Sequence, residues 1–253
     1  LKRLEMKVNN EILSGKQPNP QSILCIASYN PLYNYEWKDF VSNNAAIREV
    51  FTQQIIEPEK EKKIKPQIPV LNEISDTTSL LVKGQYEKNP YPRWITLGLP
   101  LAPRSISEIV KEINLNVVDS GIMKTEFPEI LTAGCGTGQQ SIGTAARFLN
   151  SKVLAIDLSL SSLAYAKRKA EELGIKNIEH MQADILDIEK LDLKFDIIES
   201  SGVLHHMTNP MIGWKVLSDC LKPGGLMKIG LYSELARQEI IKIRNEISQS
   251  DLG

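Results

Sequence analysis

Three glycines at alternating positions are the residues of this chain whose type and spacing most directly suggest chemistry. They are Gly134, Gly136 and Gly138, at the end of the run 130–138, and a helical pattern follows at 139–149. Glycine tolerates positive φ and lets a ligand approach the backbone. A helix N-terminus offers N–H groups without intrahelical partners. We therefore predict a buried strand that turns sharply into a helix and holds a ligand at the turn.

The spacing of the glycines separates two classes of ligand. A dinucleotide fingerprint has the form G-x-G-x-x-G, whereas here the third glycine falls one residue early and Gln139 occupies the last position. The next apolar run, 152–157, ends in Asp157. An acid about 20 residues beyond the glycines is typical of a ribose-binding carboxylate, whose two oxygens suit a vicinal diol.

Further motifs follow in order along residues 129–232. A helix capped by Ser159 is predicted to end at Gly174, and a third strand at 177–182 leads to Ala183-Asp184-Ile185. The runs 195–206 and 221–230 supply two more strands. With G-x-G-x-G as the first motif, this series resembles class I S-adenosylmethionine (SAM) methyltransferases. The fold implied is α/β, a Rossmann-like parallel sheet of about five strands in the order 3-2-1-4-5 with helices on both faces, preceded by a mainly helical region.

The resemblance also implies the cofactor and its contacts. SAM would be the cofactor and S-adenosylhomocysteine (SAH) the product. The implied cofactor-binding residues are Gly134, Cys135, Gly136 and Gly138 at the methionine end, Asp157 on the ribose, Leu158 on the adenine, Asp184 on the adenine amino group between Ala183 and Ile185, and Ser200 and Ser201 near the methyl group.

The sequence departs from the family at Thr132, because many members have an acid two residues before the first glycine. The side-chain anchor at that place would be replaced by a hydroxyl, by water or by a group from elsewhere. Most contacts of such a loop come from its backbone, so SAM binding is still expected.

Three residues are candidates for catalysis. His205 follows the fourth strand, and a histidine there could act as a general base since its pKa lies near neutrality. A structural role in holding the loop is the alternative. Tyr91 and Arg93 belong to the segment 86–94, whose prolines favour extended backbone. That segment would either close over the cofactor and contact the acceptor, or act as a rigid connector.

Composition excludes several other classes of function. The chain has 253 residues, a formal net charge of −1, 42% hydrophobic and 24% charged residues, which is ordinary for a soluble protein and disfavours a nucleic-acid partner. Its three cysteines and three histidines lack metal-ligand spacing, so no metal is predicted. No apolar run approaches the ~20 residues of a membrane span. We predict a cytoplasmic protein without a membrane partner.

Two domains are predicted, a helical extension with a connector or lid at 1–100 and a SAM-binding methyltransferase domain at 101–253. Helices are expected at 2–14, 20–29, 44–56, 103–115 and 233–248, and an extended connector at 57–69. The segments at 53–58 and 85–94 resemble the junction of bacterial proteins in which tetratricopeptide repeats (TPR) precede a methyltransferase.

The ends of the sequence lead to a further expectation. Residue 1 is Leu, and no strand is predicted after Tyr232, whereas the family adds two strands there. We expect a frame truncated at both ends. The fifth strand would then be an edge, and we predict that the N-terminal region, the last helix or a second copy of the chain covers it, with a homodimer as one outcome.

The function expected is transfer of a methyl group from SAM to an unidentified acceptor, whether a small molecule, a protein or a glycan. The alternatives are a non-catalytic SAM-binding module or an incomplete fragment, and, less favoured, an NAD-linked oxidoreductase. Asp184 after a third strand and the absence of glycine at position 139 count against the oxidoreductase.

Overall fold

The computed structural model describes residues 1–233 and 235–249, and the chain divides into two compact units, Leu1–Pro66 and Gln67–Gly253. This division lies nearer the N-terminus than the predicted boundary at residue 100. The reason is that the chain joins the sheet unit directly after it: the Leu71 N–H donates to the Gln182 carbonyl at 2.9 Å, and the Gln182 N–H donates to the Pro69 carbonyl at 2.8 Å.

The first unit is helical. Its helices are α1 (Lys2–Leu13), α2 (Pro20–Ala27), α3 (Arg48–Phe51) and α4 (Glu57–Ile64), with a π-helical stretch at Thr52–Ile56 and short 3₁₀ turns at Leu32–Asn34, Glu36–Phe40 and Lys65–Gln67. Val8 from α1 and Ile23 and Ile26 from α2 are buried in one apolar cluster with Trp37. The predicted connector at 57–69 is wrong, because α4 begins there. Pro58 is the second residue of α4, directly after the π-helical stretch, so the proline does not end the helix.

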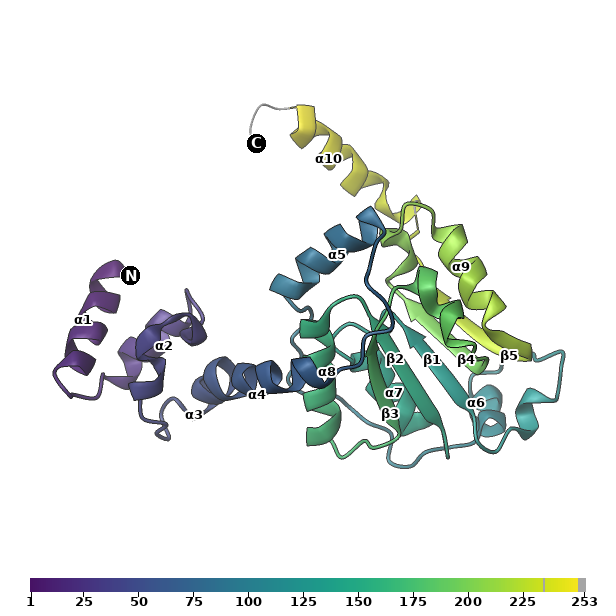
Figure 1. Ribbon diagram of the computed structural model, residues 1–253, viewed down its shortest axis with the longest axis horizontal. Helices are drawn as coiled ribbons and strands as arrows, with labels where there is room; N and C mark the ends of the chain where they lie inside the picture. The colour runs from purple at the N-terminus through teal and green to yellow at the C-terminus, as the bar shows by residue number, and fades with distance from the viewer. Residues whose placement is uncertain (234, 250–253) are drawn as a thin grey trace. The chain divides into compact units, whose positions relative to one another are not determined.

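The second unit is built on a parallel sheet of five strands in the order β3-β2-β1-β4-β5, which confirms the predicted fold class (Figure 1). The strands are β1 (Glu129–Ala133), β2 (Lys152–Asp157), β3 (Ile178–Gln182), β4 (Phe195–Ser201) and β5 (Leu221–Gly230). The inner strands are buried along nearly their whole length, as parallel strands covered on both faces must be.

Helices cover both faces of this sheet. They are α6 (Ile106–Glu112), α7 (Gln139–Arg147), α8 (Leu160–Glu172) and α9 (Pro210–Asp219), with a 3₁₀ segment at Ile185–Leu191. A further helix of this unit is α5 (Thr77–Lys88). Ile130 belongs to a core with α6 and α7, whereas its neighbour Leu131 belongs to a core with α9 and the 3₁₀ segment. The alternation of side chains along a strand thus divides the apolar residues of β1 between two layers.

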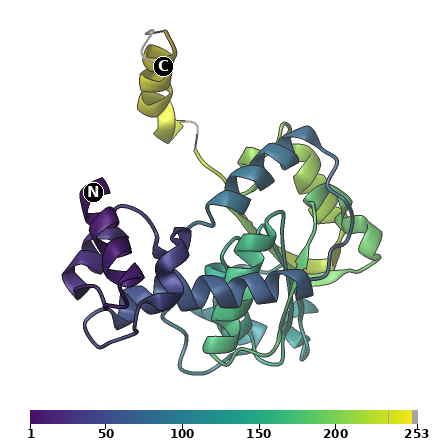
Figure 2. The same cartoon turned by 60° about the vertical axis from the view of Figure 1, so that its left-hand side comes forward.

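The last elements complete the unit. Helix α10 (Gln238–Gln249) begins five residues after the helix predicted at 233–248 and ends one residue beyond it, and its apolar residues Ile240 and Ile243 are exposed. Strand β5 is the sheet's edge, since β4 is its strand partner in the described part of the chain. That a second copy covers this edge stays a prediction. Helix α5 was not predicted; it lies beyond the C-terminal ends of the strands (Figures 1 and 2).

Gly138 and Gly143 give a test of how the glycine loop is packed. Gly138 precedes α7 with φ +86°, and a Cβ there would lie 2.6 Å from Ala166 Cβ of α8. Gly138→Ala should therefore lower the free energy of unfolding by about 2–4 kcal/mol. Gly143→Ala, inside α7 with no heavy atom within 4 Å of the new Cβ, should raise it by about 0.5–1 kcal/mol. Equal effects in urea denaturation would contradict the packing described.

Candidate active site

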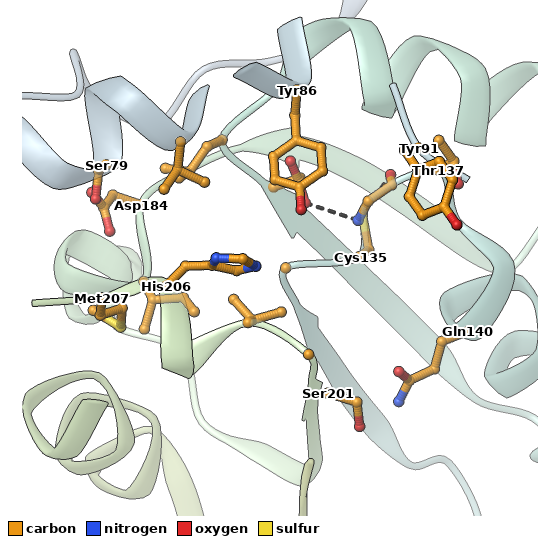
Figure 3. Close-up of a pocket in the computed structure, with 18 of the residues that line it drawn as sticks. Ser79, Tyr86, Tyr91, Cys135, Thr137, Gln140, Asp184, Ser201, His206 and Met207 are labelled. Carbon is orange, nitrogen blue, oxygen red and sulfur yellow. Dashed lines mark hydrogen bonds between the residues drawn. The ribbon is translucent and has the colours of Figure 1, made fainter. Parts of the chain in front are cut away.

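A cavity of about 410 Å³ lies where the C-terminal ends of the strands meet α5 (Figure 3). Open α/β sheets bind ligands at this edge, where the strand order reverses between β1 and β4. The glycine loop after β1 forms one wall and the ends of β2 and β3 another. The remaining walls come from the residues after β4 and from α5.

The glycine loop has the shape that its sequence requires. Gly134 and Gly136 line the cavity with φ of +74° and +53°. A Cβ on Gly134 would lie 2.3 Å from Val203, so only glycine fits there. The N–H groups of Gly134 and Cys135 both donate to the Ile156 carbonyl at 2.9 Å. Gly138, which was predicted to contact the cofactor, instead contacts α8 and is not among the lining residues.

Asp157 ends β2 and lines the cavity, as predicted. Its Oδ2 accepts from the Gly136 N–H at 2.8 Å, and its Oδ1 accepts from the Ser159 N–H at 2.9 Å. Burial raises the pKa of this carboxyl, although the N–H donors oppose the shift. Each carboxylate oxygen has two acceptor sites, so the group can hold the loop and still receive the hydroxyls of a ribose.

Asp184 lies two residues beyond the end of β3 and lines the same cavity. Its side chain is 5% exposed, and its Oδ1 accepts from the Leu186 N–H at 3.0 Å, which caps the 3₁₀ segment. Ala183, Ile185 and Leu158 also line the cavity. The two predicted carboxylates therefore face one shared space bounded by small and apolar groups, which suits a purine with a polar edge.

The segment before the sheet forms a strap over the glycine loop. Thr137 Oγ1 donates to the Pro92 carbonyl at 2.6 Å, and Trp94 Nε1 donates to the Thr137 carbonyl at 3.0 Å. Trp94 is buried, while Tyr91 lines the cavity. Arg93 lies 4.6 Å from the centre of the Tyr165 ring and is not among the lining residues. Of the two catalytic candidates in this segment, the structure thus brings only Tyr91 to the site.

Helix α5 covers the cavity on the side beyond the strand ends, and hydrogen bonds attach both ends of the helix to the rest of the unit. At its start the Thr78 and Thr208 hydroxyls lie 2.7 Å apart. At its end the Glu87 carboxylate accepts from Ser159 Oγ at 3.0 Å and from the Ser161 N–H at 3.1 Å, at the beginning of α8. Asp76, whose side chain accepts from the Ser79 N–H, is a capping signal that could have revealed this helix.

The histidine pair occupies the site differently from the prediction. His206, not His205, lines the cavity, because the 3₁₀ turn Leu204–His206 points the second ring inward. The His206 ring lies 6.2 Å from Tyr86, edge to face, and 4.3 Å from His205. His205 packs against Tyr232 at 4.0 Å, and neither of its ring nitrogens has a hydrogen-bond partner among the described residues. Burial lowers the pKa of both rings, which favours neutral imidazoles.

The two serines that end β4 also differ in position. Ser201 lines the cavity, whereas Ser200 is fully buried with no hydrogen-bond partner for its hydroxyl in the described chain. Successive strand side chains point to opposite faces, so only one of the two can reach the site. Gln140 and Tyr232 line the cavity although no motif marked them.

Comparison with known proteins agrees with this geometry. Residues 130–225 match the sequence model of a family described as a methyltransferase domain. This segment is similar to a methyltransferase domain. This confirms the class of enzyme that the ordered motifs predicted.

Three known proteins illustrate what parts of this chain are similar to. An uncharacterized protein of a Synechococcus strain is 36% identical over 122 residues, 48% of this chain and 29% of the relative. Trans-aconitate 2-methyltransferase of Deinococcus radiodurans is 28% identical over 108 residues, 43% of this chain and 39% of that enzyme. Magnesium protoporphyrin IX methyltransferase of Synechocystis PCC 6803 with bound SAH is a structural neighbour at 17% identity and TM-score 0.48, over 68% of this chain and 80% of that one. The chain spans less than half of both sequence relatives.

Two other findings concern the part of the chain that the structure describes. Within it, no three His, Cys, Asp or Glu side chains are grouped so that they could hold a metal ion. None of the helices placed there combines the length and the apolar character needed to cross a bilayer.

All three histidines have lowered pKa values, and this gives the methyltransferase domain a predicted dependence on pH. Burial lowers the pKa of His180, on β3, to about 4, and it lowers those of His205 and His206 in the same direction. Below the unfolded value of about 6.5, the unfolded chain binds more protons than the folded one, so acid destabilises the fold.

We expect the free energy of unfolding to fall by about 2 kcal/mol through His180 alone between pH 7 and pH 5. Urea denaturation across this range measures the slope, and His180→Phe should make it shallower. Stability that stays constant or rises on acidification would contradict the assignment of neutral buried histidines.

Proposed function

We propose that this chain transfers a methyl group from SAM to an acceptor. The observation that carries the proposal is that Asp157 and Asp184 line one cavity together with the backbone of the glycine loop. When bound, SAM would supply an activated methyl group on a sulfonium, so the protein's task is to bind, align and exclude water.

The residues present fit an adenosyl ligand. Asp157 would receive the ribose hydroxyls while holding the loop through Gly136, and Asp184 would receive the adenine amino group. Leu158 and Ile185 supply apolar surface beside the adenine position. Only glycine fits at position 134, because any side chain there would collide with Val203. With no side chain at this position, the loop backbone is accessible to the methionine portion of the ligand.

The acceptor side of the cavity is aromatic and uncharged. Tyr86, His206, Met207 and Tyr232 line it, and no lysine or arginine is among the lining residues that the structure describes. This supports an acceptor without negative charge, such as an amine or a neutral hydroxyl compound. A neutral His206 could accept the proton that such a nucleophile releases. Small molecules, proteins and glycans all remain within this chemical class.

The helical unit Leu1–Pro66 supports a proposal about the domain organisation of the whole protein. In the unit Leu1–Pro66, α1 contacts α2, and the pair packs its apolar faces together. Such a helix pair supports the proposal that a TPR-like array precedes the methyltransferase domain. The client would then be bound outside the catalytic cavity, and we propose a cytoplasmic location for the whole protein.

Ligand binding separates this function from its alternatives. Isothermal calorimetry should show SAH binding to the chain, with NAD giving no heat. A non-catalytic SAM-binding module would bind SAH equally well, and only methyl transfer from labelled SAM into an acceptor distinguishes it. Binding of NAD without SAH would favour the oxidoreductase.

The carboxylate of Asp184 gives a sharper prediction. Asp184→Asn leaves one acceptor oxygen, and the Leu186 N–H already uses that position. We expect SAH affinity to fall about tenfold, because the ligand loses a charged hydrogen-bond acceptor.

The matched control is Asp187→Asn, in the same 3₁₀ segment. Asp187 pairs with Lys190 and does not line the cavity, so its amide should leave SAH affinity unchanged. An equal loss in both variants would show that the segment's fold, not the Asp184 carboxylate, determines binding.

A further inference from the structure

A buried carboxylate stands beside the position where the sequence lacks its expected acid. Thr132 on β1 pairs in register with Glu199 on β4, which in turn pairs with Lys228 on β5. Thr132 is 2% exposed, and its hydroxyl has no hydrogen-bond partner in the described chain. The Glu199 side chain is 6% exposed. A charge this deeply buried must be compensated by its neighbours.

Helix α7 supplies that compensation. Glu199 Oε2 accepts from the Thr144 hydroxyl and from Gln140 Nε2, the latter at 3.2 Å. On the other side Lys228 Nζ lies 3.8 Å from Oε1, with 59% of its side chain exposed. The carboxylate therefore attaches two successive turns of α7 to the sheet, directly after the glycine loop.

This contact fixes the orientation of the Gln140 amide. An ionised carboxylate only accepts hydrogen bonds, so Gln140 must present its NH₂ group to Glu199. Its carbonyl oxygen Oε1 is then left for the cavity, which Gln140 lines near Ser201 (Figure 3). Without Glu199, the amide could rotate and present a donor instead.

We propose that Gln140 Oε1 receives the α-ammonium group of the ligand's methionine portion, and that Glu199 is the residue that positions it. The inference rests on the proposed function, because it assigns one end of the same ligand. Gln140 lies on the helix that follows the glycine loop, at the opposite side of the cavity from Asp184 in Figure 3. The carboxylate missing at Thr132 is thus replaced from the neighbouring strand, acting through an amide.

The test compares two ligands that share the adenosyl part. SAH carries the amino-acid portion, whereas 5′-methylthioadenosine lacks it. In Gln140→Leu, calorimetry should show SAH affinity falling about tenfold and methylthioadenosine affinity staying within about twofold. Glu199→Gln should lower the preference for SAH in the same direction, since it frees the Gln140 amide to turn.

Thr144→Val is the matched control. It removes the other hydrogen bond to Glu199 without touching Gln140, so it should lower thermal stability but keep the ratio of the two affinities. An unchanged ratio in Gln140→Leu would overturn the inference, and so would an equal loss of both ligands. If the unmodified chain binds neither ligand, the proposed function itself is overturned, and this assignment with it.

Discussion

The Asp157 carboxylate is the contact on which the site depends, because it holds the glycine loop by its backbone. The three glycines of the loop have positive φ and no side chains, so contacts to the loop backbone hold much of its shape. Two oxygens at the tip of β2 accept from the N–H groups of Gly136 and Ser159, so one residue joins the loop, the strand and the start of α8. The position of the loop at Gly136 and the start of α8 at Ser159 both depend on that connection.

The features that local sequence determines were predictable. Apolar runs of strand length gave all five strands, and the Ser159 cap with Gly174 gave both ends of α8. The parallel order followed from the resemblance to a known family, since no local pattern states which strands are neighbours. Asp157 and Asp184 were predictable as site residues because each lies at or just beyond the C-terminal end of a strand, at the same edge of the sheet.

The features that depend on contacts distant in sequence were not predictable. One 3₁₀ turn determines whether His205 or His206 faces the cavity. The Arg93 guanidinium lies over the ring of Tyr165 on α8. Helix α5 has almost no amphipathic pattern, because Thr78 and Ser79 line the cavity while Leu81 is exposed. Glu199 lies inside a mostly apolar strand, and only the register of β1 and β4 shows that it lies beside Thr132.

The carboxylates at and behind the cavity indicate which charge the ligand carries. Asp157 and Asp184 line it, Glu199 lies behind Gln140, and no cationic side chain is among the lining residues of the described chain. Backbone N–H groups and hydroxyls stabilise each carboxylate, yet burial still raises the pKa of Asp157. A cavity with this excess of acceptors favours a ligand that carries positive charge and several donors. A sulfonium with an ammonium group, ribose hydroxyls and an adenine amino group provides both, whereas a dinucleotide would bring its phosphates close to the carboxylates.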